Sequence, residues 1–287
     1  MTPALPAPSV ASRDSATRRL LRRAAAWLGV LAAAWGLAVG AVWLGQEQLI
    51  FRPDRLPADH VFRVPADVHE DWVEVPGARL NALHLRLPQP RGVVFYLHGN
   101  GGSLENWWVN AEFYRRLGLD LFMIDYRGYG KSSGRIDSEA QLHADVRAAW
   151  QHIAPRYAGK ARVIFGRSLG TGLAAQLAAE LQPELTVLVT PYSSMVQMAR
   201  EHYAWVPTPL LRYPLRTDAA LARVQTPVFI AHGTADTLID LSHAQALARI
   251  APQAELLVVP GGRHGDLHRF ELYLQRLAAA LDRAASR

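Results

Sequence analysis

A serine, an aspartate and a histidine follow one another in the C-terminal half of the chain, each shortly after an apolar run. Ser168 lies in the middle of the string GRSLG, which follows the apolar residues 163–165. Asp236 ends the string HGTAD and His264 ends the string GGRH. A serine hydroxyl becomes a nucleophile when a histidine takes its proton and a carboxylate holds that histidine. These three residues could therefore carry out acyl transfer.

The residues around Ser168 predict the sharp turn that such a serine needs. Residues 163–165 indicate the end of a buried strand, and residues 171–180 favour a helix. A G-x-S-x-G string between a strand and a helix forces the serine into a strained conformation that exposes its hydroxyl. A Cβ atom at either glycine would collide with the neighbouring strand or helix. The string also occurs by chance, so the prediction depends on its flanking elements.

Other residues compete for the roles of acid and base. Asp240 lies close to the candidate acid, but we expect it to cap a helix that begins at Leu241. His268 follows the candidate base by one helical turn, where we expect a surface position. His98 and His232 directly end predicted strands, and we expect them to pack or form structural hydrogen bonds. Two histidines four residues apart could also suggest a metal pair, but no third ligand is evident.

Backbone N–H groups must stabilise the oxyanion that forms during attack. The Leu169 amide, at the start of the predicted helix, is one candidate donor. The second donor is expected from the string HGNGG at residues 98–102, which follows a predicted strand over 93–97. Consecutive glycines let amides approach an anion closely. We assign this donor to the Asn100 amide, with Gly101 as the alternative and as a contact for the substrate.

The elements that must position these residues alternate along the chain. Continuous apolar runs predict buried strands at residues 93–97, 121–126, 185–190, 228–231 and 256–259. Helix-forming segments occupy residues 103–117, 138–157, 168–181, 242–250 and 266–285. Residues 72–75 and 80–87 predict an antiparallel pair around Pro76-Gly77. This alternation indicates βαβ units and a mostly parallel sheet, whose functional groups gather at the carboxyl ends of the strands.

One interval interrupts the alternation. Residues 192–217 separate two predicted strands and are rich in aromatic residues, methionine and proline. We expect a short lid over the site, and an ordinary connection with one helix is the alternative. Because prolines break the segment, it cannot hide all its large apolar side chains along one helix. Trp205 and Leu211 are therefore candidates for contact with an acyl chain that enters from the membrane.

The N-terminal region predicts a membrane segment. Residues 24–44 contain no charged side chain and are long enough to cross a bilayer as one helix. Residues 1–23 contain five arginines and one aspartate, a net charge of +4. By the positive-inside rule, the N-terminus stays in the cytoplasm and the chain after about residue 45 lies on the other side. A cleaved signal peptide, with residues 39–41 as its cleavage site, is the alternative.

Composition excludes several classes of function. The 287 residues include no cysteine, which excludes disulfides, thiolate metal sites and a cysteine nucleophile. The net charge is +6, of which the first 23 residues hold +4, so the remaining +2 is too little for a nucleic-acid surface. Half of the residues are apolar, and the length suits one large α/β domain with a buried core.

These patterns divide the chain into four parts. We expect a cytoplasmic basic tail over residues 1–23, a transmembrane signal-anchor helix over 24–44, a linker over 45–70 and a catalytic domain over 71–287. The catalytic domain would lie on the non-cytoplasmic side of the membrane. If the N-terminal segment is instead cleaved, the domain would be secreted or periplasmic.

Five strings, in this order, resemble motifs of the alpha/beta-hydrolase superfamily. They are HGNGG at 98–102, DYRGYGKS at 125–132, GRSLG at 166–170, HGTAD at 232–236 and GGRH at 261–264. More narrowly, the chain resembles the membrane-anchored serine hydrolases of this superfamily that carry a short lid. The resemblance covers residues 45–287.

The resemblance implies a fold and a set of site residues. The implied fold is the alpha/beta-hydrolase fold, of the α/β class, with a mostly parallel central sheet flanked by helices. Ser168 would be the nucleophile, Asp236 the acid and His264 the base. Asn100 and Leu169 would form the oxyanion hole. The implied substrates are esters, thioesters or lysophospholipids, and the motifs do not distinguish among them.

We therefore expect a lipase-like serine esterase that cleaves acyl esters through an acyl-enzyme, without a metal or an organic cofactor. Its partners would be a small-molecule or lipid acyl ester and the bilayer, and no nucleic acid. One alternative is a thioesterase or lysophospholipase that acts on lipids or acylated proteins. An alternative of another class is a non-catalytic, membrane-anchored binding scaffold. The order of serine, aspartate and histidine favours an enzyme, because a binding protein has no need of all three.

Overall fold

The computed structural model describes residues 10–286, which fall into two units. The first unit ends at Gln46 and the second begins at Glu47. Residues 1–9 of the expected basic tail lie outside the described residues. The compact second unit thus begins well before residue 71, where we expected the catalytic domain to start.

The first unit contains one long helix, α1, over Val10–Leu44. Its part Thr17–Leu44 contains an 18-residue window with a mean hydropathy of 1.9 and is long and apolar enough to cross a membrane. The uncharged residues 24–44 alone span about 32 Å at 1.5 Å per residue, close to the hydrocarbon thickness of a bilayer. The length and composition of the helix fit a membrane anchor or a signal sequence. A short helix, α2, follows over Gln46–Ile50.

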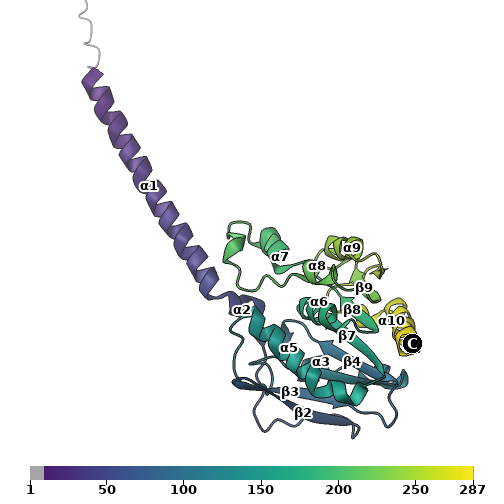
Figure 1. Ribbon diagram of the computed structural model, residues 1–287. Helices are drawn as coiled ribbons and strands as arrows, with labels where there is room; N and C mark the ends of the chain where they lie inside the picture. The colour runs from purple at the N-terminus through teal and green to yellow at the C-terminus, as the bar shows by residue number, and fades with distance from the viewer. Residues whose placement is uncertain (1–9, 287) are drawn as a thin grey trace, which may run out of the picture. The chain divides into compact units, whose positions relative to one another are not determined.

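The second unit is built on an eight-stranded sheet (Figure 1). Across the sheet, the strands are β10 (Ala254–Val259), β9 (Val228–Gly233), β8 (Leu185–Val189), β7 (Ala161–Arg167), β4 (Gly92–Leu97), β6 (Leu119–Ile124), β3 (Ala78–Leu85) and β2 (Val68–Val75). The five pairings from β10 to β6 are parallel. Strand β3 runs antiparallel to both of its neighbours, β6 and β2. The mostly parallel sheet and the antiparallel pair around Pro76-Gly77 are confirmed.

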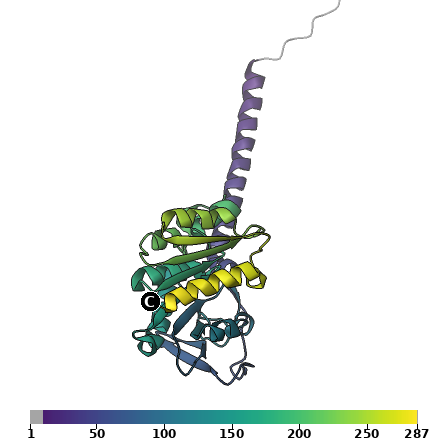
Figure 2. The same ribbon diagram turned by 90° about the vertical axis from the view of Figure 1, so that its right-hand side faces the viewer.

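Helices cover both faces of this sheet. They are α3 (Leu104–Trp107), α4 (Ala111–Arg116), α5 (Glu139–Ile153), α6 (Gly170–Leu181), α7 (Met195–His202), α8 (Thr217–Leu221), α9 (Leu241–Ile250) and α10 (Glu271–Ala285). Helices α5, α6 and α9 bury Trp150, Leu173 and Leu247 against one face. Helices α4 and α10 bury Tyr114 and Leu277 against the other, and Figure 2 shows α10 crossing in front of the sheet.

Two of the expected helices differ from the structure. The helix expected over 103–117 is two short helices, because α3 ends at Trp107 and α4 begins only at Ala111. Trp107 Nε1 donates to the Gly101 carbonyl at 2.7 Å, and this tertiary contact takes the place of a longer helix. The helix expected from residue 266 begins at Glu271, after a 3-10 turn over Leu267–Arg269 that buries Leu267.

The expected linker over 45–70 is folded onto the second unit. Strand β1 (Arg52–Pro53) pairs in parallel with β5 (Gly101–Gly102). Phe51 and Phe62 are both buried, one in each hydrophobic core. These residues belong to the unit because two phenylalanines and a short ladder remove apolar surface and backbone groups from water.

The interval 192–217 contains helix α7 and a 3-10 turn over Thr208–Leu210, without a strand among its residues. Tyr213 is fully buried, with its ring edge-on to Phe51 at 5.1 Å and its hydroxyl donating to Glu47 at 2.9 Å. Trp205 is 46 % exposed, whereas Leu211 is partly buried. The function of this interval as a lid stays a prediction.

The parallel strands place the candidate site residues at one edge of the sheet. Strand β7 ends at Arg167, directly before Ser168. Strand β9 leads into the loop of Asp236, and β10 leads into the loop of His264. Strand β4 leads into the loop of Asn100. Because these strands are mutually parallel, all four loops leave from the same edge.

A buried ion pair holds the turn after β6 against α5. Arg127 and Asp145 are both almost fully buried, and their side chains form two hydrogen bonds, at 2.5 and 2.8 Å. Arg127 also donates to the Pro76 carbonyl at 2.9 Å. Removing one member of such a pair leaves an uncompensated buried charge, which is far more costly than losing an exposed pair.

We predict that Asp145→Ala lowers the free energy of unfolding by about 3–5 kcal/mol, because Arg127 loses the buried carboxylate that pairs with it. Glu180→Ala is the matched control, since it breaks a more exposed pair with Arg147 and should cost less than about 1 kcal/mol. Denaturant unfolding of the full-length protein in detergent measures both variants. Equal losses in the two variants would contradict the structural importance of the buried pair.

Candidate active site

The turn at Ser168 depends on two glycines that lie against backbone atoms. A Cβ atom on Gly170 would lie 2.0 Å from the Leu97 carbonyl oxygen, and one on Gly166 would lie 2.4 Å from the Gly170 oxygen. The collision predicted at both positions is confirmed. Ser168 itself has a φ of +51°, a left-handed conformation that residues with a Cβ atom rarely adopt. The strain therefore falls on the serine and not on the glycines.

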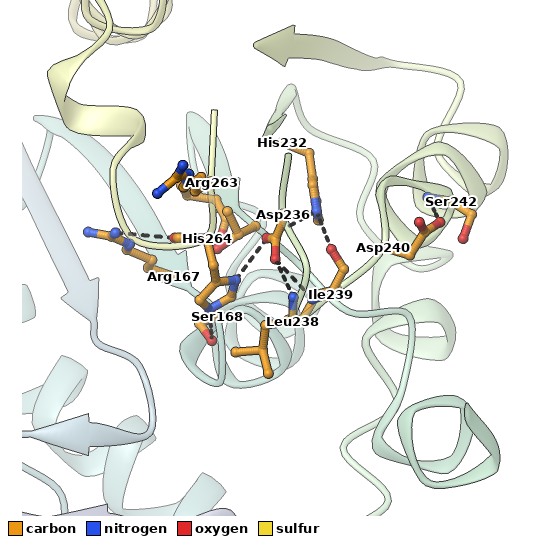
Figure 3. Close-up of polar contacts among 12 residues, drawn as sticks. Arg167, Ser168, His232, Asp236, Leu238, Ile239, Asp240, Ser242, Arg263 and His264 are labelled. Atoms are coloured by element: carbon orange, nitrogen blue, oxygen red, sulfur yellow. Dashed lines mark hydrogen bonds and ion pairs between the residues drawn. The ribbon is translucent and has the colours of Figure 1, made fainter. Parts of the chain in front are cut away.

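Ser168, His264 and Asp236 form a continuous chain of hydrogen bonds (Figure 3). His264 Nε2 lies 2.9 Å from Ser168 Oγ, and His264 Nδ1 lies 2.8 Å from Asp236 Oδ2. A proton on Nδ1 can be donated to the carboxylate, which leaves Nε2 free to accept the serine proton. The structure thus brings together the three residues that the sequence predicted, in the geometry that activates a serine.

The environment of Asp236 keeps its carboxyl group ionised. Its side chain is fully buried. Burial alone would raise the pKa of Asp236, but hydrogen bonds from His232, His264 and the Ile239 amide outweigh burial and hold the pKa well below its usual range. The Leu238 and Ile239 amides donate to Oδ1 at 2.9 and 3.0 Å. An ionised Asp236 can stabilise a positive charge on His264.

The competing residues have other surroundings. Asp240 caps α9, and its side chain accepts from the Ser242 amide at 2.9 Å, as predicted. Figure 3 shows Asp240 turned toward Ser242 and away from His264. His232 Nε2 lies 2.9 Å from the Ile239 carbonyl oxygen and 3.3 Å from Asp236 Oδ2, so it supports the loop of the acid.

The other two histidines also have structural surroundings. His98 Nδ1 lies 2.7 Å from the Gly99 carbonyl oxygen, and its ring is fully buried. His268 lies within a 3-10 turn and is partly buried, so it is less exposed than the surface position that we expected. Its burial follows from the packing of the neighbouring Leu267 in the core. Among residues 10–286, no cluster of three or more histidine, aspartate or glutamate side chains could hold a metal ion.

The loop after β4 is fixed through its carbonyl groups. The Asn100 carbonyl accepts from the Arg52 amide at 2.8 Å and from the Tyr129 hydroxyl at 2.7 Å. The Gly101 carbonyl accepts from Trp107, and the Gly99 carbonyl lies against the ring of His98. In a trans peptide the N–H points opposite to the preceding C=O, so these contacts also fix the directions of the loop amides.

One candidate oxyanion donor, Asn100, precedes Ser168 in the sequence, and the other, Leu169, directly follows it. The two donors therefore belong to different elements. Leu169 follows Ser168 and precedes the first residue of α6, so its amide has no partner within that helix. The loop of Asn100 comes close through Gly99, where a Cβ atom would lie 3.5 Å from Ser168 Cβ. Gly101 pairs with Arg52 in the short ladder. The roles of these amides, and of Trp205 and Leu211 as acyl contacts, stay predictions.

Two side chains near the site were not singled out from the sequence. The Arg167 guanidinium lies 5.3 Å from the ring centroid of Trp107 and donates to the His264 carbonyl at 3.4 Å. Trp107 in turn fixes the loop of Gly101. Arg167 occupies a variable position of G-x-S-x-G, directly before Ser168. This adjacency could have indicated from the sequence that Arg167 lies near the site. Trp107 gave no signal, because no motif contains it and its contact with Arg167 joins residues 60 positions apart in the sequence.

Comparison with known proteins finds similar sequences and similar folds. Residues 88–214 match a family model described as serine aminopeptidase, S33. Alpha/beta hydrolase domain-containing protein 17C of Xenopus tropicalis is 33 % identical over 217 residues, which cover 72 % of this chain and 67 % of that protein. The human protein of the same name is 33 % identical over 210 residues, which cover 69 % of this chain and 61 % of that protein.

Solved structures show the same fold. An esterase from Pyrococcus furiosus superposes with a TM-score of 0.64 at 19 % identity, covering 82 % of this chain and 97 % of that one. Alpha/beta hydrolase domain-containing protein 10 from mouse superposes with a TM-score of 0.58 at 17 % identity, covering 75 % of this chain and 97 % of that one. At these identities the likeness concerns the arrangement of strands and helices.

The left-handed conformation of Ser168 yields a stability prediction. Ser168→Gly and Ser168→Ala both remove the hydroxyl, so they differ only in the Cβ atom. We expect Ser168→Gly to be more stable than Ser168→Ala by about 1 kcal/mol, because strain relief exceeds the extra entropy of glycine in the unfolded chain. Denaturant unfolding of the two variants measures the difference. A more stable alanine variant would show that the turn carries no strain.

Proposed function

Because the chain belongs to the alpha/beta-hydrolase superfamily, and within it to the family of the alpha/beta hydrolase domain-containing proteins 17, we propose that it cleaves carboxylic esters through an acyl-enzyme on Ser168. It is a serine hydrolase of this fold. One observation carries the proposal: the hydrogen-bonded chain from Ser168 through His264 to the buried Asp236.

In the proposed mechanism, His264 Nε2 takes the proton of Ser168 as Oγ attacks the ester carbonyl carbon. The distance of 2.9 Å between the two atoms supports this transfer. Asp236 holds the ring through Nδ1 and stabilises the imidazolium, and its lowered pKa supports that role. The protonated His264 then donates to the departing alkoxide. A water molecule, activated by the same histidine, releases the acid from the serine.

We assign the oxyanion hole to the amides of Leu169 and Asn100. The position of Leu169 at the start of α6 supports the first assignment, because amides there have no partner within the helix and the helix dipole favours a negative charge. The fixed carbonyls of the loop after β4 support the second assignment. Such donors can stabilise the oxyanion without any rearrangement of the protein, because they are already held in place.

The same chemistry would cleave a thioester or a lysophospholipid, because only the leaving group changes. The exposed Trp205 in the interval 192–217 favours an apolar substrate, and this supports acyl esters of lipids or small molecules. A non-catalytic scaffold is the alternative of another class. The joint presence of the nucleophile, the ionised acid and the oriented histidine argues against it, since binding alone needs none of these arrangements.

We predict that Ser168→Ala abolishes both 4-nitrophenyl ester hydrolysis and labelling by a fluorophosphonate probe. Loss of the nucleophile should lower kcat by roughly four to six orders of magnitude. Asp236→Asn should lower kcat by about 10⁴, because asparagine favours the wrong tautomer of His264.

Asp240→Asn is the matched control in this series, because asparagine caps a helix about as well as aspartate and the capping contact is the only role we give Asp240. Its turnover should stay close to that of the wild type. A Ser168→Ala variant that keeps a tenth of wild-type turnover would refute the nucleophile. A large loss in Asp240→Asn with little loss in Asp236→Asn would move the acid to Asp240.

We also propose that α1 is an uncleaved anchor whose N-terminus stays in the cytoplasm, with the hydrolase domain across the membrane. The absence of charge in residues 24–44 and the net charge of +4 in residues 1–23 support this orientation. The length of the uncharged stretch 24–44 favours an anchor, since the apolar region of a signal peptide is shorter.

A reporter that is active only outside the cytoplasm, fused after Arg287, should therefore be active. Mass spectrometry of the membrane fraction should find the N-terminal arginines still attached to the chain. An inactive reporter would reverse the proposed orientation. A mature chain that starts near Val42 would replace the anchor with a cleaved signal peptide.

A further inference from the structure

A small aromatic pocket lies beside the catalytic serine, on the face of the sheet that α4 and α10 cover. We call it the Arg167 pocket, and its lining includes Tyr96, Trp107, Tyr114, Arg167, His268 and Tyr273. Its volume is about 40 Å³. This is small compared with the roughly 300–1,000 Å³ of a typical ligand pocket, so the pocket can hold a compact group rather than a whole substrate.

Arg167 enters this pocket because of its place in β7. Side chains alternate along a strand, so Arg167 shares a face with Val163 and Phe165. Both of those residues are buried in the core beneath α10. Arg167 is the last residue of the strand, where that core ends. Its guanidinium is therefore partly buried among aromatic rings, one residue away from Ser168.

The charge of Arg167 has no counter-ion within the described part of the chain. Twelve other arginines have a carboxylate oxygen within 3.0 Å, and six of these are Arg86, Arg91, Arg115, Arg127, Arg147 and Arg162. Among residues 10–286, Arg167 forms no such ion pair, and its contacts are with neutral groups: the Trp107 ring, the Tyr96 hydroxyl and, through a long hydrogen bond, the His264 carbonyl. A partly buried cation without a counter-ion is unfavourable, and a bound anion would relieve that cost.

The neighbouring groups of the pocket suit an anion as well. His268 Nδ1 is buried without a hydrogen-bond partner among the described residues. Burial and the nearby Arg167 lower the pKa of His268, so its ring is neutral at neutral pH and can donate one N–H. Burial raises the pKa of Tyr96 and of Tyr273, so these hydroxyls stay protonated. The lining that we describe thus contains donors and no carboxylate.

We propose that Arg167 binds a carboxylate carried by the ester substrate and so determines specificity. The planar guanidinium can form two parallel hydrogen bonds with a carboxylate, which few other groups can match. We assign the ligand to the substrate because Arg167 and Ser168 are adjacent and both contact His264. This inference rests on the ester hydrolysis proposed above. The carboxylate can lie on the acyl part or on the leaving group, and the test separates the two.

The test compares pairs of esters that differ in one carboxylate. Mono-4-nitrophenyl glutarate against 4-nitrophenyl butyrate tests the acyl side. Butyrate esters of 4-hydroxybenzoate and of its methyl ester test the leaving-group side. For each pair we define the selectivity as the kcat/KM of the charged ester divided by that of the neutral ester. Full-length wild type, Arg167→Met and Arg167→Lys are measured in neutral detergent.

We expect the wild type to prefer the charged ester in one of the two pairs, and the pair identifies the side. Arg167→Met should lower that selectivity by about 10- to 100-fold, the loss typical of a hydrogen bond to a charged group. Arg167→Lys should keep only part of it, because lysine retains the charge but not the paired donors. Added salt should reduce the wild-type selectivity.

Arg263→Met is the matched control. Arg263 is an exposed arginine directly before His264, so its substitution removes the same charge outside the pocket. Its selectivity should equal that of the wild type. A wild type without selectivity in either pair, or an Arg167→Met variant that loses charged and neutral turnover equally, would overturn the inference. A wild type that cleaves no ester and binds no fluorophosphonate would instead refute the proposed function, so the two failures are distinguishable.

Discussion

The close approach of helix α6 to strands β7 and β4 is the constraint on which the site depends. Gly170 lies where a Cβ atom would be 2.0 Å from the Leu97 carbonyl oxygen, so the helix begins almost in contact with the end of the neighbouring strand. This contact forces the chain to reverse within one residue, and Ser168 takes the left-handed conformation that results. The same contact brings the first turn of α6 beside the loop after β4, which the proposed oxyanion hole requires.

The rest of the sheet edge converts this turn into a set of cooperating groups. Asp236 is buried deeply enough that its carboxyl group would favour the neutral form, yet two backbone amides and two histidines hold it ionised. Its position depends on β9, and that of His264 depends on β10, while the serine depends on β7. Parallel pairing with β8 between them keeps these three strand ends at fixed spacing. Rigid elements therefore determine the hydrogen-bond distances, and the loops themselves are short.

The sequence predicted those parts of the structure that local patterns determine. The strands around Ser168 and Asp236 are continuous apolar runs, and the capping role of Asp240 follows from its residue type and place. Contacts between distant segments were not predictable. Phe51, for example, is buried because the domain supplies a second surface for it. The pocket around Arg167 likewise depends on α4 and α10, which no pattern near Arg167 reveals.

The pentapeptide around the serine also limits how this enzyme can diverge. A side chain at Gly166 or Gly170 would displace neighbouring backbone atoms, and the Leu169 side chain is buried inside the domain. Ser168 cannot be replaced without loss of the proposed nucleophile. Among these five residues, only Arg167 has a side chain that extends out of the closely packed turn, toward Trp107 and the His264 carbonyl. Natural variation within the motif should therefore concentrate at this position, so that substrate preference can drift while the turn and its reactivity persist.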